Sequence, residues 1–142
     1  MKHINEIRVL YSDTDAYGVV WHGAYVKWFE AGRVELSEML GIKLEDLESK
    51  GITFPVVEMN IRYKSPAVMN ERILVETGIK ELKQTSVTFE HLVKDKNSRK
   101  NHVIAVTTIV AIDSEGKLYR KMPEDIYLAY KTALDKSAQI FA

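Results

Sequence analysis

The chain has 142 residues, of which 46% are hydrophobic and 28% charged, a composition typical of one globular domain with its own core. Lys and Arg together number 20, as do Asp and Glu, so a net charge of zero gives no general attraction to nucleic acid or to an anionic membrane. Because the sequence contains no cysteine, disulfides, thiolate nucleophiles and cysteine-ligated metal sites are excluded.

The first predicted elements are a strand and a long helix. Apolar and polar residues alternate over residues 4–11, which indicates a strand, and a turn-rich stretch follows over 12–18. From about 24 to 40 the apolar residues recur at helical spacing, and Gly41 is a natural helix end. The face that we expect to be buried consists of Tyr25, Trp28, Phe29, Gly32, Leu36, Met39 and Leu40. The opposite face consists of Lys27, Glu30, Ser37 and Glu38.

The second half of the chain predicts a sheet. After a short helix over 43–50, alternating or β-branched segments indicate four strands, at 55–63, 71–80, 85–94 and 103–112. The last strand is almost continuously apolar, as expected for a strand buried on both faces. A closing helix is predicted from Pro123, because proline suits a first helical turn and two acidic residues follow it.

This order of elements favours an α+β domain in which an antiparallel sheet curls around the one long helix. The other face of the sheet and its edges would remain uncovered, so we expect dimerisation or higher assembly. No repeat or linker divides the chain, and we expect one domain over 1–142. The N-terminus has no apolar stretch of signal-peptide length, and no run approaches the ~20 apolar residues of a membrane span, so we expect a cytoplasmic protein.

The segment 11–25 is the candidate for chemistry, because it places a carboxylate in a turn directly before a helix. The first N–H groups of a helix have no intrahelical partner and carry partial positive charge. Amides near His22 and Gly23 could hold a thioester carbonyl and its oxyanion, with Asp15 as base or nucleophile. Two other interpretations stay open from the residues alone: simple turn and capping roles, or a metal site of Asp13, Asp15 and His22.

The same segment resembles the signature of the 4-hydroxybenzoyl-CoA thioesterase family of hotdog proteins, and is closest to the branch of bacterial short acyl-CoA thioesterases linked to the Tol–Pal system. That signature reads Asp-x-Asp-Ala-x-Gly, two β-branched residues, an aromatic, often His, and then a Tyr that opens the helix. It is met here by Asp13, Asp15, Ala16, Gly18, Val19, Val20, Trp21, His22 and Tyr25. The segments 27–35 and 55–67 resemble the helix and strand that follow in the family.

The resemblance implies a hotdog fold and an acyl-CoA thioesterase that releases a free acid and coenzyme A. By this likeness Asp15 corresponds to the catalytic aspartate, the backbone N–H of His22 to the oxyanion donor, and the side chains of Tyr11 and His22 to assisting groups. Predicted substrate contacts, where a partner subunit's strand meets the ligand, are Tyr63, Lys64, Ser65 and Pro66. We expect a homotetramer, arranged as a dimer of dimers, and no metal or cofactor.

Two departures from the family pattern, Tyr17 and the pair Gly23-Ala24, concern the shape of the pocket and so the choice of acyl group. A basic cluster, which could contact phosphates of coenzyme A but is more simply a solvated loop, consists of Lys94, Lys96, Arg99 and Lys100. Three further histidines show no partner pattern and are interpreted as structural or exposed: His3, His91 and His102. Two alternative functions remain: a hotdog dehydratase acting on hydroxyacyl thioesters, and a non-catalytic acyl-CoA-binding protein.

Overall fold

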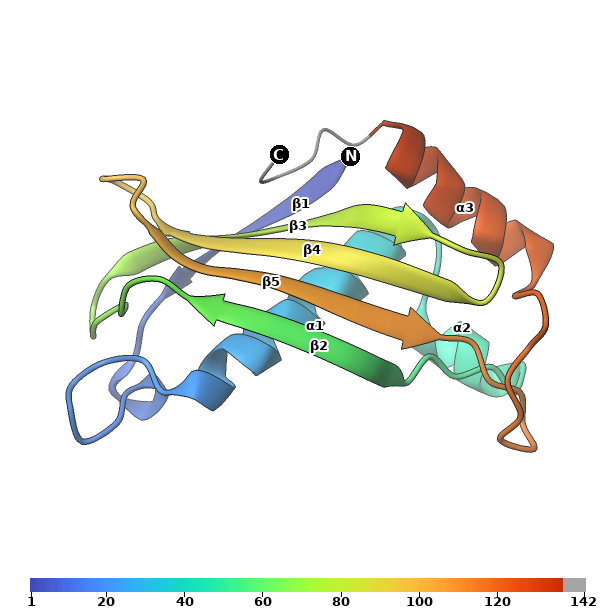
Figure 1. Cartoon of the computed structure of the whole chain (residues 1–142), viewed down its shortest axis with the longest axis horizontal. Coiled ribbons are helices and arrows are strands. Elements are labelled where there is room, and N and C mark those ends of the chain that lie inside the picture. The colour runs from blue at the N-terminus through green and yellow to red at the C-terminus, as the bar shows by residue number, and fades with distance from the viewer. Residues whose placement is uncertain (137–142) are drawn as a thin grey trace.

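Five antiparallel strands form one sheet, and a long helix crosses one of its faces (Figure 1). The computed structural model describes residues 1–136. The strand order is β1-β3-β4-β5-β2. The strands are β1 (Lys2–Arg8), β2 (Val56–Tyr63), β3 (Arg72–Leu82), β4 (Ser86–Asp95) and β5 (Asn101–Val110). The helices are α1 (His22–Met39), α2 (Leu44–Ser49) and α3 (Glu124–Asp135), with a 3-10 turn η1 at Tyr11–Asp13. The predicted α+β architecture is confirmed, and every predicted helix is present.

The helix α1 lies very close to the sheet, and Gly32 is the residue that permits this. A Cβ added to Gly32 would lie 2.2 Å from Oγ1 of Thr77 in β3, so any larger residue would push the helix away or force Thr77 to rotate. One turn earlier, Phe29 stacks on the ring of His91 in β4, with centroids 4.6 Å apart. The predicted buried face is confirmed for Tyr25, Trp28, Phe29, Gly32 and Leu36.

The last turn of α1 differs from the prediction at two residues. Met39 is wrong as a buried residue, since it ends the helix and is 56% exposed. Ser37, predicted on the polar face, is buried because Tyr130 of α3 packs against it, with 2.9 Å between the two hydroxyl oxygens. Helical spacing within α1 cannot reveal this contact, because it depends on where a helix more than 90 residues later is placed.

The core histidine His91 is completely buried and neutral. Burial, and to a lesser extent the positive charge of Arg33, lowers the pKa of His91 from 6.5 to about 3. Its Nδ1 lies 3.1 Å from Oγ1 of Thr77, and its Nε2 lies 3.1 Å from Oγ1 of Thr107. These two contacts tie β3, β4 and β5 together directly beneath α1, which makes His91 a structural residue, as expected from the sequence.

The outer face of the sheet, away from α1, is only partly covered in the single chain. Strand β5 was predicted to be buried on both faces, but it buries one, because no layer within residues 1–136 covers the other. Its buried residues are His102, Val103, Ala105, Thr107 and Ile109, and its partly exposed ones are Ile104, Val106, Thr108 and Val110. No helix within residues 1–136 is long and apolar enough to cross a membrane.

A buried carboxylate on this outer face forms ion pairs with two lysines, one of which belongs to the predicted basic cluster. Glu76 is 2% exposed and forms ion pairs with Lys2, at 2.5 Å, and with Lys94. Lys94 therefore belongs to the sheet and not to a free basic loop. Lys96 likewise pairs with Glu6, at 2.9 Å. These pairs leave only part of the predicted basic cluster available to a phosphate.

Candidate active site

The segment between β1 and α1 folds as a tight turn that extends beyond the sheet (Figure 1, blue loop at lower left). The amide of Asp15 donates to the carbonyl oxygen of Val19 at 2.9 Å, and the amide of Gly18 donates back to Asp15 at 3.0 Å. Gly18 has a φ of +78°, which favours glycine at this position. The carboxylate oxygen Oδ1 of Asp15 accepts a hydrogen bond from the amide of Tyr17 at 2.8 Å, so Asp15 does act as a turn residue.

All three predicted catalytic residues, Asp15, Tyr11 and His22, are exposed in the single chain. Strand β1 ends at Arg8, earlier than predicted, and Tyr11 opens the short turn η1 with its side chain 81% exposed. Neither Asp15 nor Tyr11 lines the pocket at the start of α1 that is described below. The aromatic side chains of Tyr17 and Trp21, on either side of the turn, are 90% and 50% exposed.

The helix α1 begins at His22, two residues before its predicted start, and its first amides are not capped. Trp21 precedes the helix and offers no capping side chain. Within residues 1–136, the backbone N–H groups of His22 and Gly23 have no hydrogen-bond acceptor, whereas the amide of Ala24 donates to Trp21. A Cβ on Gly23 would lie 2.2 Å from the indole ring of Trp21, so a larger residue here would displace this ring from the helix start.

A pocket of about 210 Å³ lies at the uncapped start of α1. Its lining combines this helix with the end of β2 and the loop that follows: Val19, Val20, His22, Tyr25, Tyr63, Lys64, Ser65 and Pro66. The hydroxyl of Tyr63 donates to the carbonyl oxygen of His22 at 3.3 Å, and the two rings meet edge-on, with centroids 4.8 Å apart. Burial raises the pKa of Tyr25, which therefore remains a neutral phenol in the lining of the pocket.

The structure thus brings together five of the predicted site residues, His22 and the run Tyr63–Pro66, although they lie some forty residues apart in sequence. A larger hollow of about 350 Å³, between α2 and α3, contains none of the predicted site residues.

Comparison with known proteins identifies the family. Residues 9–130 match the Thioesterase-like superfamily. The chain belongs to this superfamily. It is 32% identical to YneP of Bacillus subtilis (strain 168) over 131 residues, which cover 90% of this chain and 94% of that protein. It is 30% identical to the acyl-CoA thioester hydrolase YbgC of Escherichia coli O6:H1 over 126 residues, covering 88% of this chain and 92% of that one.

Solved structures give the same result for the fold. The DHNA-CoA thioesterase from Staphylococcus aureus superposes with a TM-score of 0.86 at 26% identity, covering 94% of this chain and 91% of that chain. The resemblance to hotdog thioesterases that the sequence indicated is therefore confirmed, and so is the predicted hotdog fold of a sheet wrapped around a long helix.

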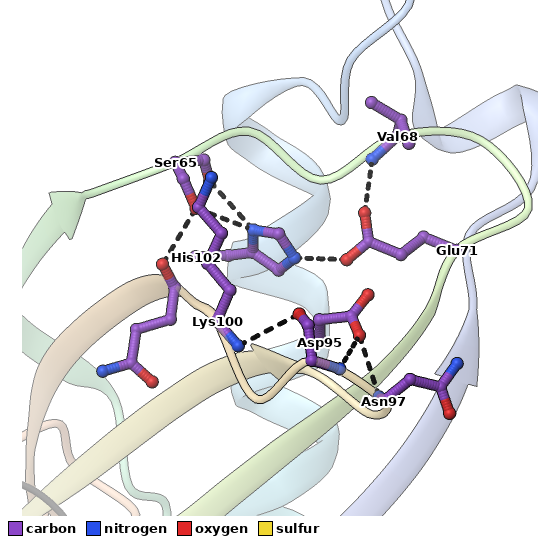
Figure 2. Close-up of polar contacts among 9 residues, drawn as sticks. Ser65, Val68, Glu71, Asp95, Asn97, Lys100 and His102 are labelled. Atoms are coloured by element: carbon purple, nitrogen blue, oxygen red, sulfur yellow. Dashed lines mark hydrogen bonds and ion pairs between the residues drawn. The ribbon is translucent and has the colours of Figure 1, made fainter.

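One polar cluster of this thioesterase-like chain was missed by the sequence interpretation (Figure 2). His102 is buried and pairs through Nε2 with Glu71, while its Nδ1 lies 3.0 Å from Oγ of the pocket residue Ser65. Sequence separations of 31 and 37 residues give no spacing signal that could have revealed the cluster. Glu71, Asp95 and His102 offer ligand atoms within 4.8 Å of one another, but protein groups already contact each of them.

Proposed function

We propose that the chain hydrolyses an acyl-CoA thioester to a free acid and coenzyme A. The single observation that carries the proposal is that the uncapped start of α1 and the predicted substrate contacts Tyr63–Pro66 line one pocket. Membership of the Thioesterase-like superfamily and likeness to the hydrolase YbgC support the same reaction. No metal or cofactor is required by this chemistry.

In the proposed mechanism the thioester carbonyl points at the backbone N–H groups of His22 and Gly23. These donors have no acceptor within residues 1–136, and they carry the positive end of the α1 dipole. An oxyanion that develops as the carbonyl is attacked would therefore be stabilised by groups that need no rearrangement. Loss of one such donor typically costs about 3 kcal/mol of transition-state stabilisation.

Asp15 is the proposed base or nucleophile: it activates a water that displaces coenzyme A, or it attacks the carbonyl itself, expels coenzyme A and forms a mixed anhydride that water then hydrolyses. The side chains of Tyr11 and His22 assist. The turn hydrogen bond from Tyr17 occupies Oδ1 of Asp15 and holds the carboxylate in one orientation, while Oδ2 has no partner within residues 1–136. The exposure of this turn in the single chain supports a site that is completed by a second copy.

We propose a homotetramer built as a dimer of dimers, from one hotdog domain that spans residues 1–142, and a cytoplasmic location. The free edge of β2, with Val56 and Val57 both exposed, is open to pairing with another strand. The partly exposed outer face of β5 provides a second surface for assembly. Sedimentation analysis should give a mass of four chains, and a monomer would contradict this assembly.

The decisive experiment compares Asp15→Asn with Asp13→Asn in a thiol-release assay across acyl-CoA chain lengths. Both variants keep a side-chain oxygen for the existing hydrogen bonds, from Tyr17 to residue 15 and from Leu10 to residue 13, so neither should unfold the turn. We expect Asp15→Asn to lose about 10²- to 10⁴-fold in kcat and Asp13→Asn to stay close to wild type.

Three outcomes would contradict the proposed reaction or its mechanism. Near-wild-type turnover by Asp15→Asn would remove the proposed base. Formation of an enoyl product from a 3-hydroxyacyl-CoA, without release of thiol, would instead indicate a dehydratase. Binding of acyl-CoA without any thiol release would indicate a non-catalytic binding protein.

A further inference from the structure

A histidine–glutamate pair, in which His102 is buried and Glu71 partly buried, contacts the wall of the pocket at both ends (Figure 2). His102, at the start of β5, is 3% exposed, and both its side chain and its carbonyl oxygen contact residues 64–65. The carbonyl accepts from the amides of Lys64 and Ser65 at 2.8 and 3.2 Å. At the other end, Oε1 of Glu71 accepts from the amide of Val68 at 3.1 Å. The short loop between these residues is thereby fixed from both sides.

The atoms that can only accept hydrogen bonds determine where the protons lie. The carbonyl oxygen of Ser65, 3.2 Å from Nδ1 of His102, is such an acceptor, so Nδ1 carries a proton. The hydroxyl of Ser65 can then accept from Nδ1 and donate its own proton to the carbonyl oxygen of Asn101, at 2.9 Å. Nε2 and the carboxylate of Glu71 share one further proton. Every polar atom of the group is then satisfied.

This arrangement holds Ser65 in place but does not activate it. A serine nucleophile needs an adjacent base that can take up its proton. Here Nδ1 of His102 already carries a proton, and the proton of the serine is directed at a backbone carbonyl. The side chains of Ser65, His102 and Glu71 contact one another in the same order as the serine, histidine and acid of a catalytic triad. Their hydrogen bonds nevertheless fix the pocket wall and do not activate the serine.

The clamped loop also contacts the turn that carries the proposed base. The carbonyl oxygen of Ala67 accepts from the amide of Val20 at 2.9 Å, and Val19 pairs with Val68 as an isolated bridge. The carbonyl oxygen of Val19 in turn accepts from the amide of Asp15. A continuous set of hydrogen bonds therefore leads from the histidine–glutamate pair to the turn.

We propose that the His102–Glu71 pair is a positioning element of the site, which keeps residues 65–68 and the Asp15 turn in place against the start of α1. Its catalytic readout rests on the thioesterase function proposed above. Because a displacement of about 1 Å in an active site can cost around 100-fold in rate, loss of the clamp should lower kcat more than it changes KM.

The test uses two substitutions at Glu71. Glu71→Ala removes the acceptor for Val68 and the partner of His102, and we expect kcat to fall about 10- to 100-fold with KM within about threefold. Glu71→Gln keeps an oxygen for Val68, and its NH₂ group can donate to Nε2 of a neutral His102, so every hydrogen bond is retained. This variant should keep kcat within about threefold of wild type.

The matched control is another histidine–glutamate pair, His3–Glu35, which joins β1 to α1 away from the pocket with 3.2 Å between Nε2 and Oε2. Glu35→Ala should lower the melting temperature without a selective loss of kcat. The proposal is overturned if Glu35→Ala and Glu71→Ala lower kcat in proportion to their loss of stability, or if Glu71→Gln is as damaging as Glu71→Ala.

A second measurement does not depend on the reaction. Hydrogen exchange at the amides of Val20 and Val68 should become at least about tenfold faster in Glu71→Ala than in wild type, relative to core amides, and should not change in Glu35→Ala. Unchanged exchange at both amides would overturn the clamp even in an active enzyme. If wild type hydrolyses no acyl-CoA but exchange responds as expected, the thioesterase proposal fails and the positioning role of the pair stands.

Discussion

The close packing of α1 against the sheet can be tested with Gly32→Ala, a substitution that adds a single methyl group. The new Cβ would lie 2.2 Å from Oγ1 of Thr77, about 1.2 Å closer than the 3.4 Å at which ordinary contact begins. The helix must lift, or Thr77 must rotate and break its hydrogen bond to His91. Overpacking of this severity costs about 3 kcal/mol, and alanine regains about 1 kcal/mol over glycine within a helix, so we expect a net loss of about 2 kcal/mol.

A double-mutant cycle with Thr77→Ala isolates the contact. Thr77→Ala alone leaves Nδ1 of His91 without its partner, which costs about 2 kcal/mol. In the double variant the nearest remaining atom, Cβ of residue 77, is 3.2 Å from the new methyl group, a contact that a small adjustment relieves. The two losses together would be about 4 kcal/mol if they were independent, whereas we expect the double variant to lose less than 2 kcal/mol.

Urea unfolding, followed by the fluorescence of the buried Trp28 on α1, measures these differences. Additive losses, or a Gly32→Ala variant as stable as wild type, would refute the claim that glycine is required by this close approach. Because lifting α1 also moves the amides of His22 and Gly23, kcat of Gly32→Ala should fall further than its folded fraction at the assay temperature explains.

Two further predictions concern pH. The pKa of His91 is about 3 in the folded state and near 6.5 in the unfolded state. The unfolded chain therefore binds the proton first as pH falls. His91 should remove roughly 1.4 kcal/mol of stability per pH unit between pH 6.5 and 3. His91→Gln should flatten this part of the stability profile in urea unfolding between pH 4 and 7; an unchanged slope would contradict a buried neutral imidazole. For Glu76, burial opposes ionisation, but hydrogen bonds from Lys2 and Lys94 outweigh it and lower the pKa. Glu76→Gln should therefore lower the free energy of unfolding by about 1–3 kcal/mol at pH 7. This difference from wild type should shrink below about pH 4, because the wild-type carboxylate is then protonated in the folded and in the unfolded state. A difference that does not change with pH would argue against the ion pairs.

The sequence predicted the elements well because each is set by a local pattern. The helical period of Tyr25, Trp28, Phe29 and Leu36 depends only on residues within α1, and alternation or β-branching marked the strands in the same way. The prediction failed where burial depends on a distant segment. Ser37 is buried only because α3 returns to cover it, which the pattern of α1 does not contain.

The residues that line the pocket were named through the family resemblance, whereas the polar cluster beside them was missed. His22 was proposed from the family signature, and the run Tyr63–Pro66 from the wider resemblance, as contacts from a partner subunit's strand; a family resemblance can relate such residues whatever their separation in sequence. The cluster of Ser65, Glu71 and His102 has no such signature and joins three segments that approach only after β2, β3 and β5 have paired. The sequence shows that these side chains can form hydrogen bonds, but each has many possible partners and the sequence does not indicate which one it contacts.

Asp15 was interpreted in two ways: its position in a turn favoured a structural role, and the family resemblance favoured a catalytic one. The turn role favoured by elementary chemistry is present, since Oδ1 accepts from the amide of Tyr17. This hydrogen bond uses one of several lone pairs of a carboxylate and leaves Oδ2 available for a water or a thioester. A base must also be held in one orientation to be effective, and the turn provides that restraint. The two roles are therefore compatible: the same turn that made Asp15 look ordinary is what would aim its free oxygen at a substrate.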